Sequence, residues 1–272
     1  MKAERRNQGA SRPGFASRLS AGLGSERTRM ARHIGIVACS AEGAALCYRT
    51  LCAEAPPLMG EHMHPEVSMH THPLGRYMVH IRSGDWGAVA DLMLSSACKL
   101  ADIGAEVAIC PDNTIHQAFA RVAAKSPIPW LHIAEAVGSE ARTRGFTTLG
   151  ITGTSYLMTG PVYPEALREM GLACVIPDEA DRERIDAIIF TELVNGVFKD
   201  ESRLYFNTVI QKLKDRGCDG VVLGCTEIPL LVDADDCPLP TLDSTRLLAR
   251  AALKAALRED HPAGAGGAAQ RA

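Results

Sequence analysis

The chain has 272 residues, of which 46% are hydrophobic and 22% are charged, and its formal net charge is -3. This composition is ordinary for soluble globular proteins, and the length suits about two domains of roughly 100 residues each. The small net charge gives no electrostatic reason to expect nucleic acid or an anionic membrane as a partner. No apolar run approaches the ~18 residues that a membrane span requires, so we expect no membrane partner either.

The two ends of the chain differ in composition from the rest. Residues 1–31 are rich in Arg, Ser and Gly with few aliphatic side chains, and residues 259–272 are rich in Gly and Ala. Neither segment can bury enough apolar surface to order itself, so we predict a disordered N-terminal extension and a disordered tail. An Arg-rich start is also typical of a transit peptide, but Glu4 and Glu26 argue against one.

The nine cysteines are an odd number and include no Cys-x-x-Cys pair. Several of them lie within apolar runs, where Cys behaves as a small hydrophobic residue. This pattern disfavours both a zinc site and a disulfide framework. We therefore expect reduced thiols and a cytoplasmic setting.

Taken in chain order, the first half alternates strands and helices. An apolar strand at 33–38 precedes a helix over 41–54, which Pro56 and Pro57 end. The elements predicted next are a strand at 66–71, a helix from an N-cap at Asp85 to a C-cap at Gly104, a strand at 105–110 and a helix from near Thr114.

The second half continues the alternation after Pro127 and Pro129, which mark a crossing between domains. The predicted elements are a helix ending near Arg144, a strand at 147–151, a helix after Tyr163, a strand at 173–176, helices from near Arg182 and over 201–216, strands at 219–223 and 240–243, and a closing helix from a cap at Ser244 to about Leu257.

Strands that alternate with helices favour parallel sheets with right-handed crossovers. We predict two similar α/β domains, each with a central, mainly parallel sheet flanked by helices. The first domain comprises residues 32–129 plus 244–258, and the second comprises residues 130–243.

Residues 100–114 and residues 213–227 follow the same pattern. Each stretch ends a helix on a glycine, continues as a short apolar strand and stops at small polar residues. In α/β sheets, ligands bind at the carboxyl ends of the strands. The repeat puts Asp112 and Cys225 at equivalent strand ends, so it predicts an active site in the cleft between two related domains.

Several segments resemble the aspartate/glutamate racemases of the cofactor-independent Asp/Glu/hydantoin racemase superfamily. Residues 224–230 (GCTEIPL) resemble the second active-site motif of these enzymes, which use paired cysteines. Residues 112–116 (DNTIH) resemble the first motif. The family's pattern is also matched, over roughly residues 33–257, by 150–154 with Gly160 and Tyr163, by 190–196 and by 201–203.

The resemblance implies an amino-acid racemase independent of pyridoxal phosphate (PLP) and of other cofactors, acting as a homodimer on a small amino acid or dicarboxylate. A base on one face of Cα and an acid on the other would be Asp112 and Cys225. Glu227 would cap the following helix or bind the substrate amine. The residues implied to hold the substrate carboxylates and the developing enediolate are Asn113, Thr114, Thr154 and Thr226.

The chain departs from the family at the first catalytic position, where it has Asp112 in place of the usual cysteine, with Cys110 two residues earlier. The loop at 39–43 (CSAEG) also lacks the Gly-rich run common in the family. A carboxyl group has an ordinary pKa of ~3.9 and a thiol one of ~8.5, so Asp112 is the weaker base. We therefore expect a slow or one-sided racemase. Alternatively, Asp112 is only a helix N-cap.

Two other functions stay open. One is a single-cysteine enzyme resembling arylmalonate decarboxylases or maleate cis–trans isomerases, in which the second-motif cysteine alone acts. The other is a non-catalytic protein that binds a small dicarboxylate. The sequence does not identify the substrate, because no single arginine in a matched motif indicates a partner for a side-chain carboxylate. The candidates for binding a side-chain carboxylate are Arg49, Arg76 and Arg82.

The remaining polar candidates are histidines and one cysteine. A metal could use the cluster His62, His64, His70 and His72, but no carboxylate or thiol lies at matching spacing, so we expect no metal. His116 is expected to orient neighbouring groups. Cys39, at the end of the first strand, either reaches the cleft or packs in the core.

Overall fold

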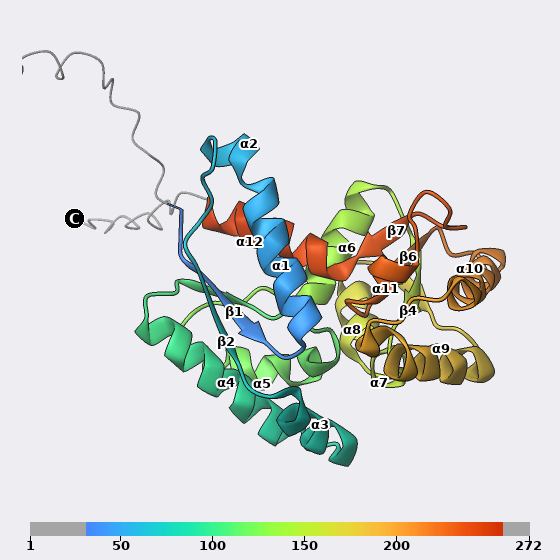
Figure 1. The fold of residues 1–272 in the computed structure, drawn as a ribbon, viewed down its shortest axis with the longest axis horizontal. Coiled ribbons are helices and arrows are strands. Elements are labelled where there is room, and N and C mark those ends of the chain that lie inside the picture. The colour runs from blue at the N-terminus through green and yellow to red at the C-terminus, as the bar shows by residue number, and fades with distance from the viewer. Residues whose placement is uncertain (1–30, 258–272) are drawn as a thin grey trace, which may run out of the picture.

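The structure is a computed structural model, and it describes residues 31–257. It contains two parallel β-sheets that lie side by side, each flanked by helices (Figure 1). The predicted fold class is confirmed. The segments predicted to be disordered, 1–31 and 259–272, lie outside the described residues apart from Ala31.

The first sheet has the strand order β2-β1-β3, and both of its pairings are parallel. Alternate residues of β1 face opposite sides: Ile36 packs in the core under α1 and α12, and Val37 packs in the core under α4. The elements of this half are β1 (Ile34–Ala38), α1 (Ala41–Glu54), α2 (Pro56–Met59), β2 (Val67–Thr71), α3 (Leu74–Ser83), α4 (Trp86–Asp102), β3 (Val107–Ile109), η1 (Thr114–Ala118) and α5 (Phe119–Ala123).

The second sheet has the order β5-β4-β6-β7, and all of its pairings are parallel. Helices α6 and α8 cover one face, while α9 and α10 cover the other. The elements are α6 (Ile133–Thr143), β4 (Thr148–Thr152), α7 (Ser155–Met158), α8 (Val162–Glu169), β5 (Ala173–Val175), α9 (Glu179–Thr191), η2 (Leu193–Asn195), α10 (Asp200–Asp215), β6 (Gly220–Leu223), α11 (Ile228–Leu231), β7 (Thr241–Asp243) and α12 (Ser244–Ala256).

The repeat seen in the sequence is a repeat of structure. Helices α4 and α10 are each followed by a glycine with positive φ, Gly104 at 95° and Gly217 at 90°, a conformation that favours glycine. In each copy the next amide returns to a leucine carbonyl of the last helical turn: Ala105 N–H to Leu100 at 2.9 Å, and Cys218 N–H to Leu213 at 3.1 Å. Strands β3 and β6 then pair with the central strands β1 and β4.

The same leucines pack against a glycine of the central strand in each sheet. A Cβ built at Gly35 would lie 3.2 Å from Leu100 Cβ, and one built at Gly150 would lie 3.3 Å from Leu213 Cβ. These distances are tighter than ordinary van der Waals contact. Both sheets therefore use a glycine to bring a helix close, which fixes the position of the strand that follows that helix.

The two sheets differ beyond the repeat. The second sheet has a full fourth strand, β7, whereas the first has only an isolated parallel bridge between Ala108 and Trp130. Residues near Trp130 thus extend the first sheet before α6 begins. Helix α12 returns from β7 to pack against α1, so that Leu248 lies in the first core and Leu247 in the second (Figure 1). The predicted domain boundaries remain a prediction.

Several elements differ from the sequence prediction. Residues 74–83 form α3, where no helix is predicted, and Pro56 opens the short helix α2 after α1 has ended. Helix α9 begins at Glu179, three residues before the predicted start. The N-cap of α12 is Asp243, whose carboxylate accepts from Arg246 N–H, and not Ser244, which is the first residue of the helix.

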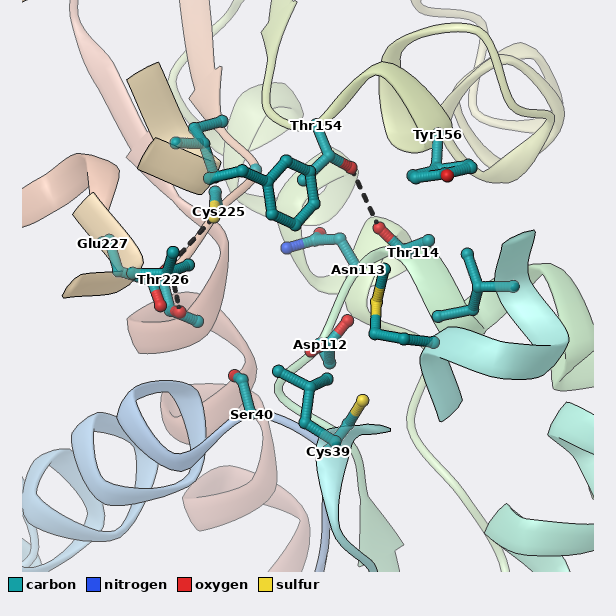
Figure 2. Close-up of a pocket in the computed structure, with 17 residues that line it drawn as sticks. Cys39, Ser40, Asp112, Asn113, Thr114, Thr154, Tyr156, Cys225, Thr226 and Glu227 are labelled. Carbon is teal, nitrogen blue, oxygen red and sulfur yellow. Dashed lines mark hydrogen bonds between the residues drawn. The ribbon is translucent and has the colours of Figure 1, made fainter. Parts of the chain in front are cut away.

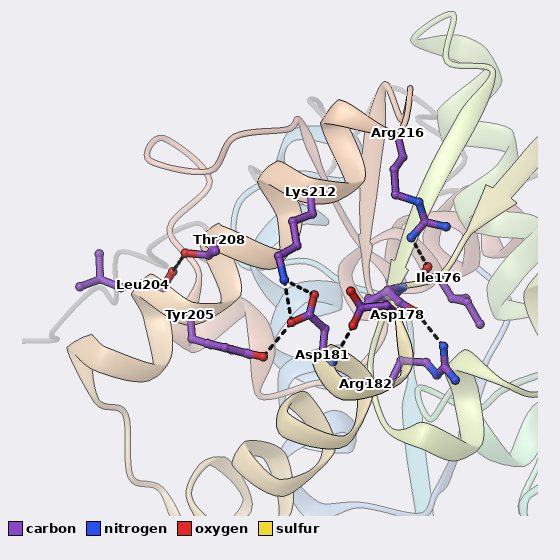
Figure 3. Close-up of polar contacts among 10 residues, drawn as sticks. Ile176, Asp178, Asp181, Arg182, Leu204, Tyr205, Thr208, Lys212 and Arg216 are labelled. Carbon is purple, nitrogen blue, oxygen red and sulfur yellow. Dashed lines mark hydrogen bonds and ion pairs between the residues drawn. The ribbon is translucent and has the colours of Figure 1, made fainter.

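A polar cluster fastens α9 to α10 (Figure 3). Lys212 Nζ donates to both carboxylate oxygens of Asp181, at 3.0 and 2.7 Å, and Tyr205 OH donates to the same group at 2.8 Å. Burial would raise the pKa of Asp181, but these hydrogen bonds and the Lys212 charge outweigh it and lower that pKa. The cluster therefore joins α9 to α10.

Candidate active site

A cavity of about 80 Å³ lies where the carboxyl ends of the strands of both sheets meet (Figure 2). Figure 2 shows Cys225 on one wall and Asp112, with Cys39 and Ser40, on another. The structure brings every predicted site residue to this cavity: Asp112, Asn113, Thr114, Thr154, Cys225, Thr226 and Glu227. Their catalytic and binding roles remain predictions.

Asp112 follows β3 and is half-buried. Burial and then the charge of Glu227 raise the pKa of the Asp112 carboxyl to about 6, against the hydrogen bonds it accepts from Cys39, Ser40 and the Thr114 backbone N–H. The bond from Thr114 is one that a helix cap makes, although the N-cap position of η1 is Asn113. At neutral pH Asp112 is mainly a carboxylate with a protonated fraction, which suits an acid–base group.

Cys225 follows β6, and its thiol faces a carboxylate. Cys225 Sγ donates to Glu227 Oε2 at 2.9 Å, and Thr226 Oγ1 donates to the same oxygen at 2.8 Å (Figure 2). Burial and then the Glu227 carboxylate hold the pKa of the Cys225 thiol well above its ordinary value. Cys225 therefore rests as a thiol. The Glu227 side chain makes no capping bond to α11, in contrast to the helix-cap prediction.

Asn113 lines the cavity, but both ends of its amide already have partners. Its Nδ2 donates to Ser244 Oγ at 2.9 Å, and its Oδ1 accepts from Tyr163 OH at 2.7 Å. Ser244 Oγ in turn donates to the Leu223 carbonyl at 3.0 Å. This buried network joins the end of β3 to α8, α12 and β6, so Asn113 positions the site more than it offers its side chain to a substrate. No local pattern in the sequence indicates this role for Ser244.

Thr114 and Thr154 meet across the cavity from the two halves of the molecule. Their hydroxyl oxygens lie 3.2 Å apart (Figure 2), and Thr154 also caps α7 through Leu157 N–H at 3.4 Å. The pair is therefore a polar contact between the halves at the cavity.

Gly43, in the first turn of α1, allows a close approach that no motif in the sequence indicates. A Cβ there would lie 2.7 Å from Thr226 Cγ2 and 2.9 Å from the Pro111 carbonyl. Ser40 caps this helix by accepting from the Gly43 N–H at 3.3 Å. The N-terminus of α1 can therefore lie close to both strand ends.

The cavity wall is largely apolar, which the sequence patterns do not indicate. Leu74, Met78 and Ile81 come from α3, and the opposite side comes from α9 and η2. The apolar and aromatic side chains that line the cavity are Leu74, Met78, Ile81, Tyr156, Ile189, Phe190 and Val194. None of the arginine candidates Arg49, Arg76 and Arg82 lines it.

The predicted histidine candidates lie outside the cavity. His116 Nε2 contacts the Cys110 carbonyl at 3.0 Å beneath the Asp112 loop, and burial lowers the pKa of His116 to about 3. His70 contacts Lys99 and Ser96, and His72 contacts Arg76. Within residues 31–257, no group of three or more His, Cys, Asp or Glu side chains is arranged to hold a metal ion.

The family model for Asp/Glu/hydantoin racemases matches residues 34–252, which is most of the chain. The chain belongs to this family. Its two-sheet fold and a cavity at the strand ends agree with that membership. None of the helices within the described part of the chain is long and apolar enough to cross a membrane.

Solved structures of the family share the fold. A Yersinia pestis protein that carries an Asp/Glu racemase name is 31% identical with a TM-score of 0.78, and the alignment covers 84% of this chain and 100% of that one. An aspartate racemase homologue from Pyrococcus horikoshii is 26% identical with a TM-score of 0.74, over 84% and 100% of the two chains. The glutamate racemase from Francisella tularensis, solved with D-glutamate, is 16% identical with a TM-score of 0.60, over 81% and 79%.

A curated protein from Pectobacterium carotovorum subsp. carotovorum, an uncharacterized protein in the pnlA 3′ region, is 26% identical over 89 residues. The match covers 33% of this chain and 58% of that protein, so the chain spans less than two thirds of that relative's length.

Proposed function

We propose that the protein is a PLP-independent amino-acid racemase in which Asp112 and Cys225 exchange the proton on Cα. One observation carries the proposal: two acid–base side chains from equivalent strand ends line a single cavity between the two sheets. A racemase needs an acid and a base in opposite protonation states on the two faces of one carbon. A carboxyl with a pKa of about 6 and a protonated thiol provide that pair at neutral pH.

The proton transfers balance without a cofactor. The Asp112 carboxylate takes the α-proton, and the electron pair moves into the substrate carboxylate to give an enediolate. The Cys225 thiol gives its proton to the opposite face of Cα. Asp112 is then protonated and Cys225 is a thiolate, and proton exchange with water, or the reaction of a molecule of the opposite enantiomer, returns both groups to their resting states.

Glu227 makes the two acid–base groups, Asp112 and Cys225, unequal in the resting enzyme. Its carboxylate accepts the Cys225 S–H, so it favours the thiol and disfavours the thiolate beside it. In the prevailing form of the enzyme Asp112 is a carboxylate and Cys225 is a thiol, which suits the enantiomer whose α-proton faces Asp112. The other enantiomer requires the minor form, in which Asp112 is protonated and Cys225 is a thiolate. Unequal kcat values in the two directions follow from this asymmetry.

We assign carboxylate binding to the hydroxyl groups of Thr114, Thr154 and Thr226, supported by the backbone N–H groups at the strand ends. Oriented donors of this kind stabilise the enediolate more than the ground state, because charge develops on the oxygens in the transition state. Asn113 contributes by positioning Asp112 through its contacts with Tyr163 and Ser244.

Deuterium exchange tests the proposal. Each enantiomer of a panel of amino acids is incubated with the protein in deuterated water, and Cα–H exchange and optical rotation are followed together. We expect exchange accompanied by inversion, and loss of the inversion in Cys225→Ser, which retains only the Asp112 base. Inversion that persists in a folded Cys225→Ser protein would contradict the assignment.

A single-cysteine reaction is the second candidate, because the first position holds Asp112 and not a thiol. Arylmalonate and maleate, added to the same assay, distinguish it: decarboxylation or isomerisation without amino-acid exchange favours this candidate. A non-catalytic binding protein would be stabilised by the ligand without any turnover. A homodimer in the cytoplasm remains part of the proposal, and sedimentation at micromolar concentration tests the dimer.

A further inference from the structure

The charges that line the cavity are all of one sign. Of its 17 lining residues, the ionic ones are Asp112 and Glu227, both acidic. Within the part of the chain that the structure describes, no Lys, Arg or His side chain lines the cavity. A substrate that carries a second carboxylate on its side chain would bring that charge next to two carboxylates with no cation to pair it.

The outer wall of the cavity is apolar and open to water. Leu74 on α3 is 42% exposed, Phe190 at the end of α9 is 38% exposed, and Val194 on η2 is 43% exposed. These residues come from both halves of the molecule and line the same cavity. Apolar surface that stays wet in the free protein is a favourable contact for an apolar group of a ligand, because burial removes it from water.

We infer that the side chain of the substrate, attached to the carbon that exchanges its proton, is apolar and carries no carboxylate. The inference rests on the proposed function and assigns the substrate class of the same site. The Cα end lies at Asp112 and Cys225, and the substituent lies against Leu74, Met78, Phe190 and Val194. An ionic side chain placed against this wall would lose water without gaining a partner.

The apolar group could belong to a free amino acid or to a 5-substituted hydantoin, the third substrate in the family's name. Both present an acidic C–H beside a carbonyl. Two matched pairs of compounds distinguish the effect of the side chain from the effect of the compound class. L-leucine is compared with L-aspartate, and 5-isobutylhydantoin is compared with 5-carboxymethylhydantoin. Blanks without protein correct for spontaneous exchange of the hydantoins.

In deuterated water, the full-length protein is expected to exchange the isobutyl member faster than the carboxymethyl member, by on the order of tenfold or more, in whichever series reacts. Faster exchange of the carboxymethyl member in that series would overturn the inference and leave the racemase proposal standing. Exchange of neither series, with leucine raising the melting temperature more than aspartate does, would contradict the racemase proposal but support the substrate class.

Two valines give a matched pair of variants. Val194 is 43% exposed and lines the cavity, whereas Val197 is 41% exposed and does not. Val194→Arg supplies the missing cation, so we expect the aspartate-to-leucine rate ratio to rise about tenfold or more, and Val197→Arg is expected to leave it unchanged. Equal ratios in the two variants would contradict the placement of the substrate side chain.

Discussion

The loops that follow β3 and β6 occupy equivalent places in the two sheets, but different partners hold their side chains. After β3, the Asn113 amide is tied to Tyr163 and Ser244, and Asp112 accepts hydrogen bonds from the β1 loop. After β6, the polar side chains bond among themselves, because Cys225 and Thr226 both donate to Glu227. The repeat therefore supplies the same backbone twice, and the side chains at its end supply the chemistry.

This difference sets the order in which the two groups lose their protons. Glu227 raises the pKa of both Asp112 and Cys225, yet the carboxyl remains by far the stronger acid. A racemase with two cysteines relies on two groups of similar pKa. Here the two groups are unlike, and the comparison predicts that the two faces of Cα are treated unequally.

The largest expected effect comes from removing the acid–base group at one strand end or the other. Asp112→Asn and Cys225→Ser should each lower racemisation by about 10²–10⁴-fold, since each removes one acid–base group. The two variants should differ in which enantiomer exchanges its Cα proton with solvent without being inverted. Asp112→Asn retains only Cys225 and should exchange the proton of one enantiomer, whereas Cys225→Ser retains only Asp112 and should exchange the proton of the other. NMR of both enantiomers in deuterated water measures this.

The matched control is Asp112→Cys, which makes the two ends chemically alike and should bring the two kcat values closer together. The ratio of the kcat/KM values cannot report the asymmetry, because the two enantiomers have equal free energy. Full inversion by Asp112→Asn would reduce Asp112 to a helix cap, since Asn caps about as well as Asp.

The pH profile tests the same pair. The active form holds one proton between Asp112 and Cys225, so below a pH of about 6 both groups are protonated and kcat/KM should fall for both enantiomers with one midpoint. Glu227→Gln removes the charge that helps to raise the pKa of Asp112, so this midpoint should move to lower pH. Asp112→Cys should move it to higher pH. A midpoint unchanged in both variants would exclude Asp112 as the titrating group.

The sequence predicted the site better than it predicted the surroundings of the site. The glycine-ended helices and the short motifs at 112–114 and 224–227 locate the strand ends, because those features are local and repeat. The sequence does not predict helix α3, because the helix is short and Pro73 and Gly75 weaken its pattern. The apolar wall that α3 forms with α9 arises from tertiary packing and leaves no local pattern in the sequence.

The role of Asn113 shows the same limit. Its position in the motif predicts a substrate contact, and the structure places its amide between Tyr163 and Ser244, residues far from it in the chain. Ser244 looked like a helix cap because small hydroxyl residues favour that position, and Asp243 takes the cap instead. Hydrogen bonds between distant segments depend on how the two sheets are placed, which no local pattern records.

A smaller effect is expected from removing the hydrogen bond that holds Asn113 at the end of β3. Tyr163→Phe leaves the buried Asn113 Oδ1 without its donor, at a cost of about 1–3 kcal/mol in the free energy of unfolding. It should also lower kcat, because Asp112 is the neighbouring residue. Tyr205→Phe is the control: it removes a similar bond to Asp181, neither residue lines the cavity, and the change should lower stability without changing kcat. Equal kcat values in the two variants would remove the positioning role of Asn113.

The smallest expected effect comes from replacing the glycine in a central strand of each sheet by alanine. Gly35→Ala would set a methyl group 3.1 Å from Ala105 Cβ and 3.2 Å from Leu100 Cβ, both fixed to the backbone. Gly150→Ala would first meet Leu213 Cδ1 at 2.8 Å, the end of a flexible side chain.

Both changes overpack a helix against a strand, at about 1–2 kcal/mol after allowing for the lower backbone entropy of Ala. Gly35→Ala should cost at least as much as Gly150→Ala, because Leu213 Cδ1 can rotate away and the fixed Leu213 Cβ lies slightly farther off, at 3.3 Å. Urea unfolding with an unchanged m-value measures both. Gly75→Ala, with nothing within 4 Å of its added Cβ, is the control and should not destabilise the protein. A larger loss for Gly150→Ala would mean that α10 is held against β4 more rigidly than α4 is held against β1.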